Sequence, residues 1–235
     1  MSDDTPSSAS VGSFSDAPRG TREVAGARIG EILATMRSNG ALPSIESGIP
    51  SDQPFVSSAW VQSLPRRFGH LDGFSNPYIP DNARLLLSQW AAGQVSGNIL
   101  ILGLPGTGKT ELAVSLVARR IESIRKGGMF LDATEFVAQM RPGGIPRLTE
   151  AVGVTELLLD DLGGGGRSQM SEFEIEALFR LINGRWSQER HIVVTSNLGV
   201  EELKVRIGER SYDRLRHNAT AITLVGDSLR GGSHV

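Results

Sequence analysis

The chain has 235 residues, which is enough for one α/β domain with a substantial core plus a short additional segment, but not for two large domains. Its formal net charge of -2 excludes binding to nucleic acid through bulk positive charge, so any DNA contact must come from a local patch. The lack of cysteine excludes disulfide bonds and argues against a zinc ribbon or zinc finger.

The beginning of the chain predicts no packed structure. Residues 1–20 are mostly Ser, Asp, Pro and Gly, which is typical of a disordered tail. The start "MSDDTPSSAS" is acidic and serine-rich, where a signal peptide is basic and then apolar, and no apolar window approaches the roughly 20 residues of a membrane span. We therefore expect a soluble protein of the cytoplasm that makes no contact with a membrane.

A single helix is predicted before the main domain. Residues 21–40 place apolar side chains at helical spacing and end in Asn39 and Gly40, which form a good C-cap pair. The apolar stripe of this helix either packs on its own domain or another copy, or docks a partner protein. Residues 41–73 follow as a proline-containing linker, in which "SAWVQSLPRRF" can form a helical turn.

The ordered domain is predicted over residues 74–235. Asp81 is suited to N-cap a helix through "NARLLLSQWAA", which Gly93 ends. Beyond it, strand and helix patterns alternate, which is typical of a parallel sheet covered by helices. The predicted strands span residues 98–102, 129–132, 156–160, 191–196 and 221–225. The predicted helices span residues 109–125, 134–140, 171–187 and, in two short pieces, 200–217.

A phosphate-binding loop is predicted at "GLPGTGKT", which satisfies the G-x-x-x-x-G-K-[ST] pattern between a strand and a helix. Glycines let successive backbone N–H groups face the β-phosphate, and the helix adds its positive N-terminal end. The ammonium of Lys109 reaches the β- and γ-phosphates, and the Thr110 hydroxyl binds Mg²⁺. Only three of the 24 basic residues are lysines, and one of them stands at position 109 because a guanidinium does not fit this loop. The predicted ATP ligands are Gly103, Pro105, Gly106, Thr107, Gly108, Lys109, Thr110 and Glu111.

Two further strands end in polar residues. "ELLLDDLGGGG" ends in Asp160, which is predicted to hold Mg²⁺, and Asp161, which is predicted to position or deprotonate the attacking water. "HIVVTSNL" ends in Asn197, which can bridge the γ-phosphate and that water. The alternative for Asp160 and Asp161 is a solvated strand end, and the alternative for Asn197 is an ordinary turn residue.

Together with "YDRLRH" and "GDSLR", these motifs resemble the DnaC/IstB-type branch of AAA+ ATPases, which comprises bacterial and phage helicase loaders and their transposition-helper relatives. The resemblance covers about residues 74–230. It implies an AAA+ P-loop NTPase core, of the α/β class, with a five-stranded parallel sheet flanked by helices and little or no C-terminal helical lid.

The resemblance also assigns roles to two arginines. It implies that Arg214 is the arginine finger, which completes the ATP site of a neighbouring subunit, and that Arg230 is the sensor 2 arginine. The alternative for Arg214 is a surface residue paired with an acid of its own helix, either Asp213 or Glu209. Two other arginines remain candidates for the finger, Arg210 and Arg216.

The chain departs from the family pattern at Asp161, where Glu is usual, and this implies slow turnover. Without cysteines it cannot build the zinc-binding domain that some loaders use for the helicase, so partner binding falls to the helix in residues 21–40 or elsewhere. For single-stranded DNA, "MRPGGIPRL" offers Arg141 and Arg147, although an exposed loop with two solvated arginines fits equally well.

These observations predict an ATP-dependent helicase loader. It would bind a replicative DNA helicase and single-stranded DNA, self-associate into an ATP-dependent oligomer, and use ATP binding and hydrolysis as an assembly and release switch. The alternatives are a transposition helper ATPase that forms filaments on DNA and a non-catalytic nucleotide-gated binding module. A GTPase is not expected, because no N-K-x-D motif follows the P-loop.

Overall fold

The computed structural model describes residues 58–65, 68, 73–142, 147–164 and 169–231. The predicted tail (1–20), the predicted amphipathic helix (21–40) and most of the predicted linker lie outside these residues. In the described part of the chain, no helix combines the length and the apolar character that crossing a membrane requires.

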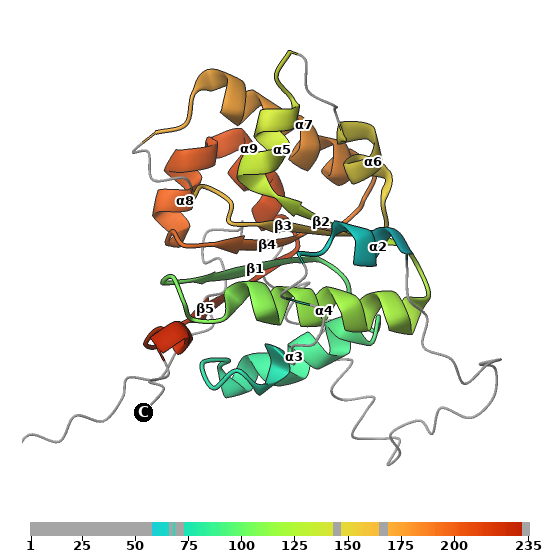
Figure 1. The fold of residues 1–235 in the computed structure, drawn as a ribbon, viewed down its shortest axis with the longest axis vertical. Helices are drawn as coiled ribbons and strands as arrows, with labels where there is room; N and C mark the ends of the chain where they lie inside the picture. Colours follow the sequence, from blue (N-terminus) through green and yellow to red (C-terminus); the bar gives the residue numbers. More distant parts are fainter. Residues whose placement is uncertain (1–57, 66–67, 69–72, 143–146, 165–168, 232–235) are drawn as a thin grey trace, which may run out of the picture. The chain divides into compact units, whose positions relative to one another are not determined.

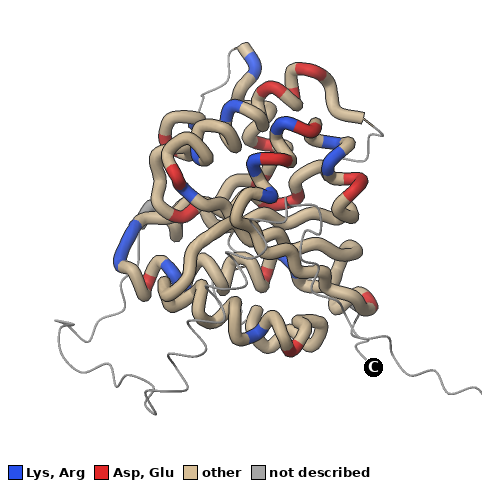
Figure 2. Tube along the Cα trace, turned by 180° about the vertical axis from the view of Figure 1, so that it is seen from behind, with Lys and Arg blue, Asp and Glu red and all other residues tan. Residues whose placement is uncertain are grey.

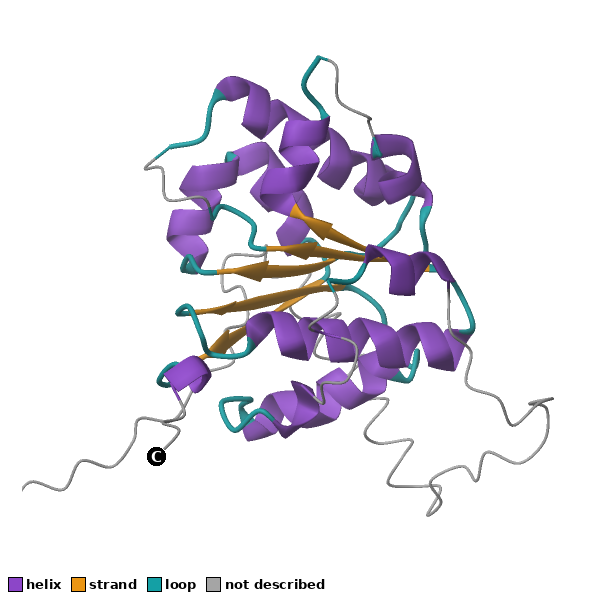
Figure 3. Ribbon diagram, viewed as in Figure 1, coloured by secondary structure: helices purple, strands orange, loops and turns teal. Residues whose placement is uncertain are grey.

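Five parallel strands form one sheet in the order β2-β3-β4-β1-β5 (Figure 1). Figure 3 shows the arrows pointing the same way, so all carboxyl ends meet at one edge of the sheet. Each strand confirms a predicted one, with β4 starting two residues later than expected and β5 two residues earlier. The bounds are β1 Asn98–Gly103, β2 Gly128–Asp132, β3 Glu156–Asp160, β4 Val193–Ser196 and β5 Ala219–Leu224.

Helices cover both faces of the sheet (Figure 1). α3 and α4 lie on one face and α5 to α9 on the other, while α2 packs against β2. The helix bounds are α2 Ser58–Ser63, α3 Asp81–Ala91, α4 Lys109–Ile124, α5 Ala133–Gln139, α6 Leu148–Gly153, α7 Glu172–Ser187, α8 Val200–Ile207 and α9 Glu209–Arg216, with 3-10 turns η2 Gly73–Ser75 and η3 Leu229–Gly231.

Local capping explains where the helices around the site begin. The Ser171 side chain accepts from the backbone N–H of Glu174, whose carboxylate accepts in return, so a capping box starts α7. The Asp132 side chain caps α5 by accepting from the backbone N–H of Glu135. Asp81 does not cap α3 as predicted, because Pro80 occupies the N-cap position and Asp81 lies in the first turn.

Packed structure begins earlier in the chain than residue 74. Trp60 on α2 and Phe68 are only 4% and 6% exposed and belong to the hydrophobic core between the sheet and α4. The Ser63 hydroxyl also accepts from the backbone N–H of Phe130 on β2. Part of the range expected to be a linker is therefore part of the domain, and the helical turn considered there is α2.

Candidate ATP-binding site

The loop between β1 and α4 has the backbone that a phosphate-binding loop requires. Gly106 and Gly108 lie at φ of 88° and 81°, where a side chain is strained. A Cβ at Gly106 would collide with the Ser228 side chain, and one at Gly108 would meet the Asn76 amide. The loop therefore lies between the segments that carry Asn76 and Ser228. A larger residue at either glycine would force one of these segments to move.

Those two segments also donate hydrogen bonds to the loop. Asn76, which precedes α3, donates its side-chain amide to the Thr107 carbonyl at 2.8 Å. The backbone N–H of Leu229 on η3 donates to the Gly106 carbonyl at 2.9 Å. With these carbonyls engaged, the loop is fixed by contacts outside the motif. Asn76 was missed in the sequence, since no pattern links it to the loop.

Lys109 is buried at the start of α4, 7% exposed, with its Nζ donating to the Leu104 carbonyl at 2.7 Å. Burial lowers the pKa of Lys109, and the nearby carboxylates of Asp161 and Asp160 offset part of that effect. Arg230 lowers this pKa further, and it follows Leu229, the η3 residue whose N–H contacts the loop. A buried ammonium held by one carbonyl is suited to a phosphate oxygen, which is a stronger acceptor.

Asp160 ends β3 beside the first turn of α4, where Thr110 Oγ1 donates to Asp160 Oδ1 at 2.9 Å. Thr195, on the neighbouring strand β4, donates to the same oxygen at 2.5 Å. Burial raises the pKa of Asp160, and the charges of Asp161 and Asp132 raise it further, while the two hydroxyls act in the opposite direction. The carboxylate thus bears an electrostatic cost that a cation would remove.

These oxygens fit Mg²⁺, which prefers carboxylate and hydroxyl oxygens and usually completes its coordination with water and substrate phosphates. Thr110 and Asp160 are the residues that would hold the ion. Among the described residues, no group of three or more His, Cys, Asp or Glu side chains forms a metal site.

Asp161 is oriented by its surroundings. Its backbone has φ of 54°, an uncommon value for a residue other than glycine, and its N–H donates to Thr195 Oγ1 at 2.9 Å. Asn197 Nδ2 donates to Asp161 Oδ1 at 2.7 Å, and any side chain at position 164 would collide with the carboxylate. The structure therefore brings Asp161 and Asn197 together, and it adds Thr195, which contacts both Asp160 and Asp161.

Arg214 lies at the opposite edge of the sheet. Asn98, the first residue of β1, donates to the carbonyl of Leu215 at 2.9 Å, so the end of α9 packs beside the amino end of β1. The P-loop follows the carboxyl end of β1. The five residue steps of this strand, at about 3.3 Å each, place that end about 16 Å from Asn98. Arg214 therefore cannot reach the P-loop of its own chain.

The ion pairs considered for Arg214 are not formed. Asp213 pairs with Arg216 at 2.7 Å, and Glu209 pairs with Lys204 at 3.2 Å. Arg214 instead donates from Nε to the side-chain oxygen of Asn183 at 2.6 Å. The alternative of an Arg214 paired with an acid of its own helix is therefore wrong.

The two arginines that were predicted to bind DNA each lie near an acidic residue. Arg141 lies 4.0 Å from Glu174, and Arg147 lies 3.2 Å from Glu150. Arg147 also lines a cavity of about 460 Å³ that Asp160 borders. Figure 2 shows basic and acidic residues interleaved on the helices above the sheet. Each arginine therefore already lies near a carboxylate, which would weaken its attraction for a DNA phosphate. Residues 143–146 between them lie outside the described part.

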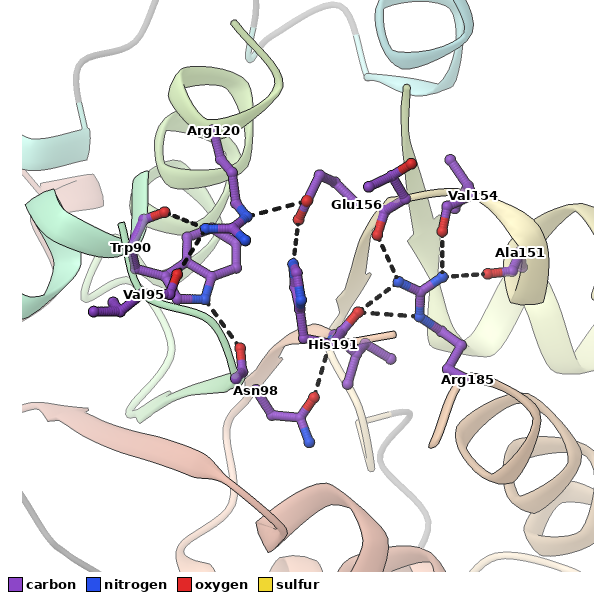
Figure 4. A network of polar contacts seen from close by, with 12 residues as sticks. Trp90, Val95, Asn98, Arg120, Ala151, Val154, Glu156, Arg185 and His191 are labelled. Carbon is purple, nitrogen blue, oxygen red and sulfur yellow. Dashed lines mark hydrogen bonds and ion pairs between the residues drawn. The ribbon is translucent and has the colours of Figure 1, made fainter. Parts of the chain in front are cut away.

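A second polar cluster lies at the amino edge of the sheet (Figure 4). Glu156, the first residue of β3, is 1% exposed and accepts from Arg120 at 3.0 Å and from His191 at 2.7 Å. Arg185 donates to the carbonyls of Ala151, Val154, Thr155 and His191, which join α6, α7 and β4. Each charge in this cluster has a partner from the chain itself, so its role is structural. No periodicity in the sequence predicted this cluster.

Sequence comparison supports a family assignment. Residues 86–234 match the family of IstB-like ATP binding proteins. An ATP-binding protein of insertion sequence IS21 from Pseudomonas aeruginosa is 26% identical over 181 residues, 73% of this chain and 65% of that protein. One of insertion sequence IS5376 from Geobacillus stearothermophilus is 32% identical over 145 residues, 57% of this chain and 55% of that protein. The chain thus spans less than two thirds of these relatives.

Solved structures share the fold at lower identity. The DnaC helicase loader has a TM-score of 0.58 at 20% identity, covering 68% of this chain and all (100%) of that one. DnaI has a TM-score of 0.57 at 18% identity, covering 70% of this chain and 93% of that one. A replication initiator DnaA bound to AMPPCP and single-stranded DNA has a TM-score of 0.54 at 20% identity, covering 70% and 51%. The family match and this shared fold identify the chain as a member of the IstB/DnaC-type AAA+ ATPase family.

Proposed function

We propose that the protein is a Mg²⁺-dependent ATPase whose bound nucleotide controls self-association. The observation that carries this proposal is the 2.9 Å hydrogen bond between Thr110 and Asp160. It joins two motifs 50 residues apart at the point where a phosphate-bound metal ion needs oxygen ligands. Chance placement of a strand-end acid does not explain this contact with the P-loop threonine.

The chain's own groups have defined tasks in this reaction. Thr110 and Asp160 would hold Mg²⁺, which would supply positive charge against the charge that develops on the phosphates. Lys109 exchanges the Leu104 carbonyl for phosphate oxygens, which compensates its buried charge. Asp161 orients the attacking water and accepts its proton, while the amide of Asn197 holds that carboxylate in place. Because Asp is one methylene shorter than Glu, we expect slow turnover.

Completion of the site requires a second copy of the chain. Arg214 lies at the sheet edge opposite to its own P-loop, so its guanidinium can stabilise a transferring phosphoryl group only in a neighbouring subunit. Arg230, whose charge lies near Lys109, would contact the nucleotide bound by its own chain. ATP would thereby link two subunits, and hydrolysis would release them.

For the cellular setting we propose a transposition helper that assembles on DNA and recruits a transposase. Both sequence relatives are ATP-binding proteins of insertion sequences. A loader of a replicative helicase, which binds single-stranded DNA, is the second candidate. Its support is the likeness in fold to the DnaC helicase loader at 20% identity.

The ATPase proposal is tested by measuring the rate per subunit against protein concentration. We expect the rate to rise with concentration and with added DNA, and Arg214→Ala to lower the stimulated rate about a thousandfold. Lys109→Ala should lose nucleotide binding and serves as the inactive reference. A wild-type rate that equals that of Lys109→Ala would favour the non-catalytic binding module instead.

The setting is tested separately. Filaments of the full chain on duplex DNA, formed with a non-hydrolysable ATP analogue and seen by electron microscopy, would support the transposition helper. Co-purification with the replicative helicase of the host, without filament growth on duplex DNA, would overturn it in favour of the loader.

A further inference from the structure

One face of α7 lies against α9 and surrounds Arg214. Phe179, Asn183 and Trp186 are spaced by four and three residues, so they share that face of the helix. The Arg214 Nε donates to Asn183 Oδ1 at 2.6 Å. Its guanidinium carbon lies 5.2 Å from the centre of the Phe179 ring and 5.1 Å from that of Trp186. We call Phe179, Asn183 and Trp186 the α7 cradle.

The α7 cradle holds the guanidinium from one side and leaves its charge intact. The Nη1 group donates once more, to the Arg210 carbonyl at 3.1 Å. In the part of the chain that the structure describes, the three other guanidinium N–H groups have no hydrogen-bond partner. A guanidinium with free N–H groups on both terminal nitrogens can bind a phosphate through two hydrogen bonds.

The partner of Arg214 distinguishes it from the neighbouring Arg216. Both Nε groups donate to an oxygen, but Arg216 donates to the carboxylate of Asp213 at 2.8 Å, which neutralises its charge and repels phosphate. Arg214 donates to a neutral amide. An amide orients the side chain at no cost to its positive charge, which is the property that a residue acting on a phosphoryl group needs.

The cradle is itself fixed by buried contacts. Arg185, next to Trp186 and 1% exposed, donates to the carbonyls of Ala151 and Val154, both at 2.8 Å. A Cβ at Gly184 would collide with Val152, so α7 and α6 approach closely there. Trp186 nevertheless remains 45% exposed, and it borders a cavity of about 510 Å³ that Arg214 also lines. The second half of α7 is therefore a rigid support beside an open space.

We propose that Asn183, aided by Phe179 and Trp186, is a positioning residue that holds Arg214 ready to enter the ATP site of a neighbouring copy. This proposal rests on the proposed function. It names the residues that orient Arg214 before it enters the ATP site of the next subunit. A side chain held in its working orientation loses less conformational entropy when the subunits meet.

The first test replaces Asn183 by leucine, which has a similar volume and no hydrogen-bond acceptor. We expect the stimulated ATPase rate of Asn183→Leu to fall about tenfold to a hundredfold, as for the loss of one hydrogen bond to a charged group. Its affinity for ATP, measured at low protein concentration, should not change. The matched control is Gln188→Leu, because Gln188 makes the same amide contact with Nε of Arg190 at 3.1 Å. This control should keep the wild-type rate.

The second test mixes subunits. Lys109→Ala subunits cannot bind ATP but retain the α7 cradle and Arg214, so mixing them with Asn183→Leu subunits should restore hydrolysis at the intact P-loops. The double variant Lys109→Ala/Asn183→Leu should not restore it. A merely structural defect in Asn183→Leu would remain in both mixtures and would overturn the proposal. If Asn183→Leu does not fold, Trp186→Leu takes its place, with the same expected outcomes.

Failure of this proposal differs from failure of the proposed function. If Arg214→Ala lowers the rate and both Asn183→Leu and Trp186→Leu keep it, the cradle has no positioning role and the ATPase proposal stands. If Arg214→Ala also keeps the full wild-type rate, Arg214 does not complete the ATP site of a neighbouring copy. The positioning proposal then falls together with the role proposed for Arg214, while the ATPase itself stands.

Discussion

Strand β3 carries a buried carboxylate at each end, and the two differ in what surrounds them. Glu156 at the amino end lies against Arg120 and His191, whose hydrogen bonds and charges overcome the effect of burial and hold the pKa of Glu156 below its usual value. Asp160 at the carboxyl end accepts from two neutral hydroxyls, and burial raises the pKa of Asp160. One acid is matched by cations of its own chain, while the other lacks such a match.

The same difference separates the basic residues of the two edges. At the amino edge, burial lowers the pKa of Arg185 to about 9, which leaves it charged at neutral pH while it donates to several carbonyls. At the carboxyl edge, Lys109 is buried with the Leu104 carbonyl as its hydrogen-bond acceptor. Perturbed ionisable groups whose charges are incompletely compensated are typical of functional sites, and this supports the proposal that Asp160 and Lys109 bind a metal ion and a phosphate.

The largest effect should come from Asp161→Asn at the carboxyl edge. The amide cannot accept the proton of the attacking water, so we expect the ATPase rate to fall about 100-fold to 10,000-fold, with ATP affinity retained. Steady-state hydrolysis and nucleotide binding measure the two properties. Asp81→Asn in the first turn of α3 is the control and should change neither. Normal turnover in Asp161→Asn would show that Asp161 is not the catalytic acid.

At the amino edge we expect a loss of stability and not of activity. Glu156→Gln removes the charge that Arg120 requires, and breaking a buried ion pair in this way should lower the free energy of unfolding by about 3 kcal/mol. Denaturant unfolding measures it. The control Glu150→Gln removes one partner of a partly exposed pair and should cost less than about 1 kcal/mol. If both variants lost the same small amount, the amino-edge cluster would not be a structural one.

The two carboxylates should give opposite responses to pH. The lowered pKa of Glu156 contributes stability that is present above its unfolded pKa and is lost as pH falls through the folded pKa. The raised pKa of Asp160 has the other sign, because stability falls as pH rises from its unfolded pKa through its folded pKa. The measurement is the free energy of unfolding of wild type minus that of each variant, Glu156→Gln or Asp160→Asn, between pH 3 and about 8. Plotted against pH, the two differences should slope in opposite directions. Parallel slopes would contradict the comparison.

Much of this comparison was accessible from the sequence. Apolar runs of four to six residues between helical patterns predicted all five strands, because a parallel sheet buries both of its faces. The P-loop, Asp160 and Asp161 follow from local patterns, since glycines, a strand and a helix suffice to place a phosphate. Such motifs are local in sequence, and their geometry hardly depends on the rest of the fold.

The residues that the sequence did not predict depend on tertiary order. Thr195 contacts both acids only because β4 lies next to β3 in the sheet, although 35 residues separate Thr195 from Asp160 in the sequence. Asn183 contacts Arg214 through packing of α7 on α9. Trp60 lies in a proline-containing stretch whose composition indicates a linker, yet its ring is buried. The six residues of α6 are too few for helical periodicity to be visible.

The smallest expected effect is a gain in stability at the carboxyl edge. Asp160→Asn keeps an oxygen that can accept from Thr110 and Thr195, and it removes a buried charge that Asp161 and Asp132 repel. We expect the free energy of unfolding at neutral pH to rise by about 1 kcal/mol without nucleotide, whereas binding of Mg²⁺ and ATP weakens. Denaturant unfolding with and without Mg²⁺-ATP separates the two effects, and Asp213→Asn, which breaks an exposed pair, is the control. A destabilised Asp160→Asn would mean that the charge of Asp160 is already compensated within the chain, and the distinction between the two ends of β3 would then fail.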